Sequence, residues 1–75
     1  MTPEKFNSLQ SSDKEDLLLL AVEVCQKSDE LFNYELFKLN DFFIEVRMNY
    51  QHRLHKIVTA YNLEELPVMY EGEVS

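Results

Sequence analysis

Residues 36–48 read Leu-Phe-Lys-Leu-Asn-Asp-Phe-Phe-Ile-Glu-Val-Arg-Met, and this stretch decides the fold. Asn40 and Asp41 at its centre tolerate the left-handed backbone that a two-residue hairpin turn needs. The turn would set Leu39 opposite Phe42, and alternation along the strands would place the apolar side chains together. One face would carry Phe37, Leu39, Phe42, Ile44, Val46 and Met48, and the other would pair Tyr34 with Arg47. The sequence therefore predicts an antiparallel hairpin here.

Two helices are predicted before the hairpin. Thr2-Pro3-Glu4 has the N-cap, proline and acidic residue of a helix start, and this short helix would turn Phe6 and Leu9 inward and end before Ser11. Ser12 and Glu15 have capping-box spacing and open a second helix. Leu17, Leu18, Leu20 and Ala21 follow at helical spacing.

A first strand is expected from about Ala21, because residues 22–27 alternate apolar with polar. Val22 and Val24 would face inward, although these residues also fit the last turns of the preceding helix. After the hairpin, residues 49–53 form a polar loop and the β-branched run from Leu54 to Tyr61 predicts a fourth strand, whose facing is ambiguous. Asn62 would cap a helical turn ended by Pro67, and residues 71–75 would be loose.

These elements predict a single small domain over residues 1–75 of the α+β class. Two N-terminal helices would pack on a three- to four-stranded antiparallel β-meander, followed by a short C-terminal helical turn. The alternative is an all-α helical hairpin, since residues 4–66 lack glycine and proline and several apolar residues fit a heptad. The heptad positions would be Phe32, Leu36, Leu39, Phe43, Val46, Tyr50, Ile57 and Ala60. The sheet is favoured because the helix would leave six large apolar side chains off its seam.

Charge is unevenly distributed along the chain, which carries a net −7. Residues 1–30 and 62–75 each carry −4, whereas residues 31–61 carry +1. Nucleic acid is an unlikely partner, because phosphate binding needs clustered lysine and arginine. No apolar run is long enough to span a membrane, and one cysteine, Cys25, cannot form an internal disulfide. A cytoplasmic protein is expected.

Three stretches resemble a family of short uncharacterised bacterial proteins. They are residues 2–9 (TPEKFNSL), residues 36–46 (LFKLNDFFIEV), and the polar loop with Ile57. Members typically read PEEFN and later YxLGDFYVEV; Asn40 stands where glycine is expected, and Gln10 where proline is. The resemblance implies a small helix-plus-sheet fold and brings no activity and no catalytic residues.

The sequence contains no recognisable catalytic or metal-binding motif, so no enzyme activity, metal or cofactor is expected. His52 and His55 lie three residues apart, but metal sites usually need three or four convergent ligands. Cys25 is interpreted as a small core residue, since nothing near it in sequence would lower its thiol pKa. The chain has one glycine, at position 72, which excludes a glycine-rich phosphate loop.

The remaining hypotheses concern surfaces. We expect a protein–protein interaction module that forms a homodimer, because a small chain has a marginal core, a meander leaves edge strands, and the second sheet face keeps exposed apolar side chains. Two alternatives stay open: an acidic protein that mimics nucleic acid and inhibits a basic partner, and a weak binder of phosphate or acidic partners through the 50–56 loop. The candidate partner-binding residues are Tyr34, Leu36, Phe43, Arg47, Tyr50, His52, Arg53, His55 and Lys56.

Overall fold

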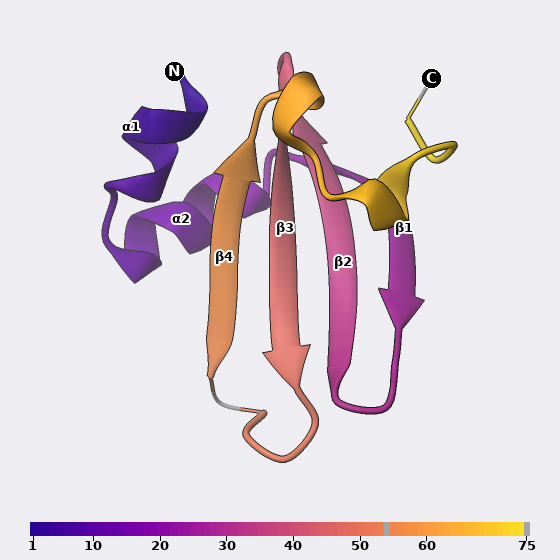
Figure 1. Cartoon of the computed structure of the whole chain (residues 1–75). Coiled ribbons are helices and arrows are strands. Elements are labelled where there is room, and N and C mark those ends of the chain that lie inside the picture. Colours follow the sequence, from indigo (N-terminus) through magenta and orange to yellow (C-terminus); the bar gives the residue numbers. More distant parts are fainter. Residues whose placement is uncertain (54, 75) are drawn as a thin grey trace.

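The computed structural model describes residues 1–53 and 55–74 and has the predicted α+β architecture (Figure 1). Two short helices precede a four-stranded sheet, and two 3-10 turns follow it. The elements are α1 (Pro3–Asn7), α2 (Ser11–Leu18), β1 (Val22–Ser28), β2 (Phe32–Leu39), β3 (Phe42–Asn49), β4 (Lys56–Tyr61), η1 (Leu63–Glu65) and η2 (Val68–Tyr70). Strands occupy most of residues 31–61, so the helical-hairpin alternative is wrong.

The sheet is a meander in which each strand pairs antiparallel with the next, in the order β1-β2-β3-β4. The predicted hairpin register is confirmed, with Leu39 opposite Phe42 and Tyr34 opposite Arg47. Asn40 occupies the turn with φ of 56°, the left-handed conformation for which asparagine was expected there.

α1 begins as predicted and packs beside β4, the last strand of the sheet. The Thr2 hydroxyl accepts the Lys5 backbone N–H at 3.2 Å, and Pro3 occupies the first turn. The side-chain amide of Asn7 pairs with the backbone of Ala60: it donates to the carbonyl at 3.1 Å and accepts the N–H at 2.7 Å. Asn7 therefore occupies hydrogen-bonding groups on the outer edge of β4.

α2 differs from the prediction at both ends. It begins two residues earlier, with Gln10 in place of Ser12 as the N-cap and without a capping hydrogen bond from the Gln10 side chain, so the expected capping box of Ser12 and Glu15 is wrong. The helix ends at Leu18, and Leu20 is exposed and does not face inward. The reason is that the next residues turn toward β1, with Ala21 N donating to the Leu18 carbonyl at 3.1 Å.

β1 is confirmed as a strand, but its predicted facing is wrong at Val22. The register shifts between Glu23 and Cys25, where a β-bulge sets two residues against one of β2. Val22 is exposed as a result, while Val24 packs half-buried against the second sheet face. Strict alternation from the sequence could not place this extra residue.

β4 begins at Lys56 and pairs with β3 in continuous register, with no bulge. The predicted start at Leu54 lies outside the described residues. Val58 and Ala60 pack in the core beneath the helices, which settles the facing that the sequence left ambiguous.

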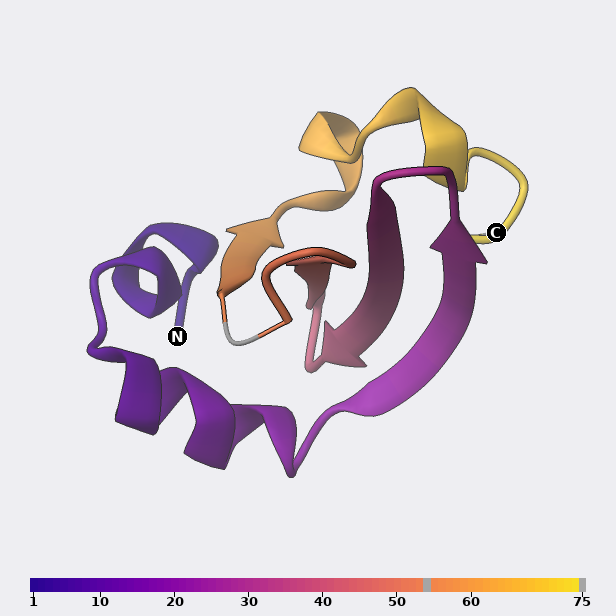
Figure 2. The same cartoon turned by 90° about the horizontal axis from the view of Figure 1, so that it is seen from below.

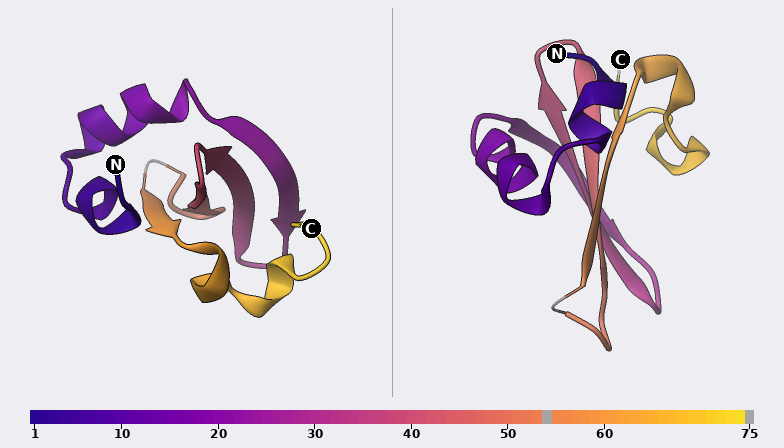
Figure 3. Two further views of the ribbon diagram at one scale, coloured as in Figure 1. Left: turned by 90° about the horizontal axis from the view of Figure 1, so that it is seen from above. Right: turned by 90° about the vertical axis from the view of Figure 1, so that its left-hand side faces the viewer.

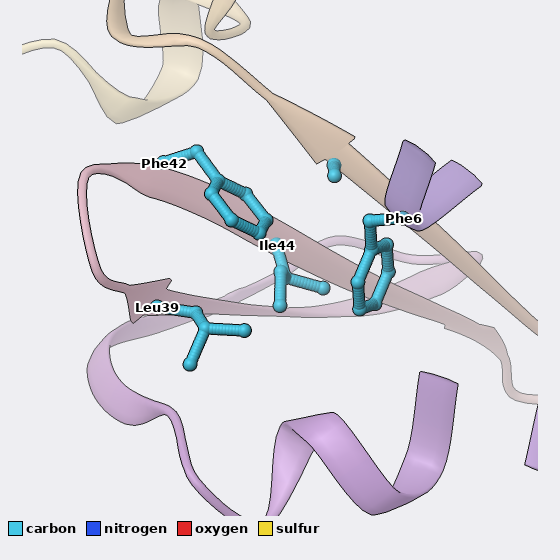
Figure 4. Close-up of a cluster of buried hydrophobic side chains, with 5 residues drawn as sticks. Phe6, Leu39, Phe42 and Ile44 are labelled. Carbon is cyan, nitrogen blue, oxygen red and sulfur yellow. The ribbon is translucent and has the colours of Figure 1, made fainter. Parts of the chain in front are cut away.

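The main core lies between the helices and the sheet (Figure 4). It consists of Phe6 from α1 with Leu39, Phe42, Ile44 and Ala60 from the sheet. Phe6 and Phe42 pack with ring centroids 6.1 Å apart and tilted planes. Leu9, Leu17 and Leu18 add half-buried contacts, so the predicted inward positions of Phe6 and Leu9 are confirmed.

A second core lies on the opposite face, where the sequence predicted exposure. The C-terminal segment (residues 62–74) crosses this face of the sheet (Figures 1 and 2), and Tyr70 covers Leu36 and Phe43. Val74 packs against the same cluster, and Glu73 forms a 3.2 Å salt bridge with Lys27. The expectation of loose residues is therefore wrong for residues 71–74; Ser75 lies outside the description.

Candidate functional site

The helices cover only part of their sheet face, and a groove lies beside α2. Seen from the side in Figure 3, the sheet extends past both helices toward the loop after β3. The groove has a volume of about 730 Å³, within the range of small-ligand pockets. Its apolar lining consists of Leu18 from α2, Phe37 from β2, Val46 from β3, and Ile57 and Val58 from β4. We name this feature the helix-face groove.

Charged side chains surround the apolar floor. Lys14, Arg53 and Lys56 line the helix-face groove together with two carboxylates, Glu15 and Glu35. The groove therefore has a formal charge of +1, whereas the rest of the chain carries twelve acidic and four basic residues. A groove with three cations on an otherwise acidic protein favours a ligand with acidic groups by electrostatic complementarity.

Glu35 is the titratable group most affected by this setting. Burial, followed by a hydrogen bond with Glu23 and repulsion from its charge, raises the pKa of the Glu35 carboxyl. The ammonium group of Lys56 opposes that rise. The protonation of Glu35 therefore changes the charge of the groove floor as the pH falls.

An apolar projection lies at the end of α2, the helix that forms one wall of the groove. Leu19, Leu20 and Val22 are 84%, 71% and 70% exposed. Single exposed apolar side chains are common on protein surfaces, but three large ones within four residues are characteristic of contact surfaces. We name these three residues the apolar corner.

The structure divides the predicted partner-binding residues among three places. Arg53 and Lys56 line the helix-face groove, as described above. Tyr50, His52 and His55 lie exposed around the β3–β4 loop, where the two imidazole ring centroids are 6.3 Å apart. Of these five residues, two therefore line the groove and three do not.

Tyr34, Leu36, Phe43 and Arg47 belong to the second sheet face. Leu36 and Phe43 are buried beneath Tyr70, so they are unavailable to a partner in this conformation. Arg47 lies opposite Tyr34, with its guanidinium carbon 5.2 Å from the Phe32 ring centroid. Within the described part of the chain, Nε of Arg47 is buried without a hydrogen-bond partner.

Tyr34 and Cys25 are held in their neutral forms. The Tyr34 hydroxyl donates to Oδ2 of Asp29 at 2.9 Å, and burial together with this bond raises the pKa of the phenol. Burial, with the nearby charge of Glu73, likewise raises the pKa of the Cys25 thiol. Neither group is prepared for nucleophilic attack at neutral pH.

The described residues contain neither a cluster of metal ligands nor a helix that could span a membrane. No group of three or more histidine, cysteine, aspartate or glutamate side chains gathers in a way that could hold an ion. No helix there has both the length and the apolar character needed to cross a bilayer.

Sequence reasoning missed the contributions of α2 to the site. Lys14 and Leu18 line the groove, and Leu19 and Leu20 form most of the corner, yet none of them was a candidate. The usable signal was the run of four leucines at residues 17–20, because a short helix can bury only part of such a run.

No protein-family model, curated protein or solved structure matches this chain. The resemblance to short bacterial proteins remains a prediction.

Proposed function

We propose that this chain is a non-enzymatic protein-interaction module that binds an apolar segment flanked by acidic residues in its helix-face groove. The observation that carries the proposal is the combination of an apolar floor with Lys14, Arg53 and Lys56 at its margin, on a chain of net charge −7. Apolar burial would supply affinity, and the cations would select for acidic flanks. We also propose a cytoplasmic location, consistent with a single free cysteine.

The chemistry of the groove supports binding more than catalysis. Glu35 is flanked by a second carboxyl, Glu23, and by Lys56, and no histidine or cysteine is among the described residues that line the groove. General acid–base work needs a positioned partner for the reacting group. The role proposed for Glu35 is to make binding depend on pH.

A peptide titration tests the proposal. The probe is a synthetic peptide of three leucines flanked by glutamates, added to ¹⁵N-labelled protein and followed by NMR chemical shifts. The expected result is saturable shifts at Phe37, Val46 and Val58, which line the groove floor. A charge-inverted peptide with lysine flanks should bind more weakly.

Charge-reversal variants supply the control. Arg53→Glu with Lys56→Glu should weaken peptide binding roughly tenfold, because each exposed ion pair contributes up to about 1 kcal/mol. Lys5→Glu changes an exposed cation of α1 outside the groove and should leave binding unchanged. Shifts confined to the second sheet face, or equal weakening by all variants, would contradict the proposal.

A further inference from the structure

We propose that the occupant of the helix-face groove is the apolar corner of a second copy of this chain, within a two-fold symmetric dimer. This inference rests on the proposed function and names its partner. Leu19, Leu20 and Val22 would enter the groove of the partner, while the partner's corner enters the first copy's groove.

The corner and the groove are complementary in chemistry. The corner presents three large apolar side chains that are not covered by any described part of the chain. The groove presents an apolar floor that is likewise left open by the described residues. The corner is also flanked by Asp16 and Glu23, both exposed. The corner therefore has the composition that the groove's cations favour: an apolar segment between acidic residues.

The two features also lie on one side of the molecule. α2 forms a wall of the groove, and the chain passes directly from the end of α2 through the corner into β1 (Figure 2). A two-fold axis can pair a projection and a recess on the same side with their counterparts, so both corner–groove contacts form at once. Two-fold pairing closes the assembly at two copies, whereas a one-sided contact leads to larger rings or to open filaments.

Both edges of the sheet carry features that oppose pairing with another strand. Asn7 occupies both backbone groups of Ala60 on the edge of β4, and the bulge at Glu23–Cys25 breaks the regular ladder at the edge of β1. Both are devices that discourage pairing between exposed strand edges. On the second face, the C-terminal segment already covers Leu36 and Phe43. The helix side combines exposed apolar side chains, those of the corner, with a groove that could receive them.

Sedimentation velocity over about 1 to 100 μM tests the dimer, because that window brackets dissociation constants of ordinary transient dimers. The wild type is expected to change from monomer to dimer as its concentration rises. Leu20→Glu should remain a monomer, because it places a charge at the centre of the corner. Val68→Glu is the matched control: Val68 is 75% exposed on η2, away from the corner and the groove, and its variant should dimerise like the wild type.

Mixing variants tests the reciprocal geometry. Arg53→Glu with Lys56→Glu alters the groove and should weaken dimerisation, as Leu20→Glu does. A 1:1 mixture of the groove variant and the corner variant should recover part of the association, because one wild-type corner then meets one wild-type groove. Far-ultraviolet circular dichroism of each variant establishes that it folds.

Each outcome has a distinct meaning. A wild type that stays monomeric to 100 μM, yet binds the leucine–glutamate peptide in its groove, overturns the dimer and leaves the proposed function standing. A monomer that also fails to bind the peptide overturns both. A dimer weakened equally by Leu20→Glu and Val68→Glu, or one with no recovery in the mixture, contradicts the corner–groove contact.

Discussion

The phenol of Tyr70 donates a 2.7 Å hydrogen bond to Oε2 of Glu45, and both residues are buried on the second sheet face. Glu45 is 6% exposed, and burying a carboxyl is costly unless a donor compensates for lost water. Tyr70 provides that donor while its ring covers Leu36 and Phe43. The C-terminal segment is therefore an integral part of the fold.

Tyr70→Phe should reduce the free energy of unfolding by about 1 to 3 kcal/mol, because it leaves the buried Glu45 carboxyl without its donor. The ring and its apolar contacts remain, so the loss reports the hydrogen bond. Urea unfolding measures the change. A double-mutant cycle with Glu45→Ala, which removes the acceptor oxygens, supplies the control; full additivity of the two substitutions would show that the bond does not couple them.

Removing the Asn7 side-chain amide should leave the backbone N–H and C=O of Ala60, at the edge of β4, without these partners. Asn7→Ala removes both hydrogen bonds to the Ala60 backbone and should cost about 1 to 2 kcal/mol, at the usual net value of about 1 kcal/mol for each bond. Ser8→Ala, in the cap of the same helix, should cost less because the Ser8 hydroxyl bonds only within α1, to the Lys5 carbonyl. Equal losses for the two variants would mean that Asn7 acts on α1 alone.

Glu35→Gln should stabilise the protein at neutral pH. The pKa of Glu35 is raised in the folded state, so its protonated form is favoured there. The stability linked to this proton is present below the unfolded pKa of about 4.3 and is lost as the pH rises through the higher folded value. The variant should therefore exceed the wild type in thermal stability at pH 7, and the two should converge near pH 4.

Glu64 provides the comparison for that measurement. It is exposed in η1 on the far side of the sheet, and Glu64→Gln should follow the wild type at both pH values. A Glu35→Gln variant that is less stable than the wild type at pH 7 would mean that attraction to Lys56 outweighs burial and the repulsion from Glu23.

The hairpin and the first helix start could be predicted because their signals are local. Asn40 determines a left-handed turn by its own backbone preference, and Thr2 caps α1 through a residue three positions away. Asn62 likewise forms the predicted capped turn, with Glu65 reaching back to it. Each depends on residues within a few positions of one another.

Other features depend on residues distant in sequence and could not be predicted. Tyr70 covers Leu36 from more than thirty positions away, so the second face looked exposed from its strand alone. The bulge beside Val24 reverses the alternation that predicted Val22 inward. In the leucine run, helical spacing alone cannot tell where the chain leaves α2, and that exit point creates the apolar corner.

The candidate site was predicted only in part for the same reason. Arg53 and Lys56 were selected as the cations of a loop, and both line the groove. Lys14 of α2, about forty residues earlier, lines the same groove because α2 packs on the sheet, and that packing cannot be deduced from local sequence patterns.

Intermolecular paramagnetic relaxation enhancement tests the corner–groove contact most directly. A nitroxide is attached to Leu19→Cys in a Cys25→Ser background, and this copy is mixed with ¹⁵N-labelled wild type. The corner–groove contact should broaden the amide signals of Phe37, Val46 and Val58 in the labelled copy. Broadening that is absent or uniform, or that is centred on residues 62–74, would contradict the placement of the corner in a partner's groove.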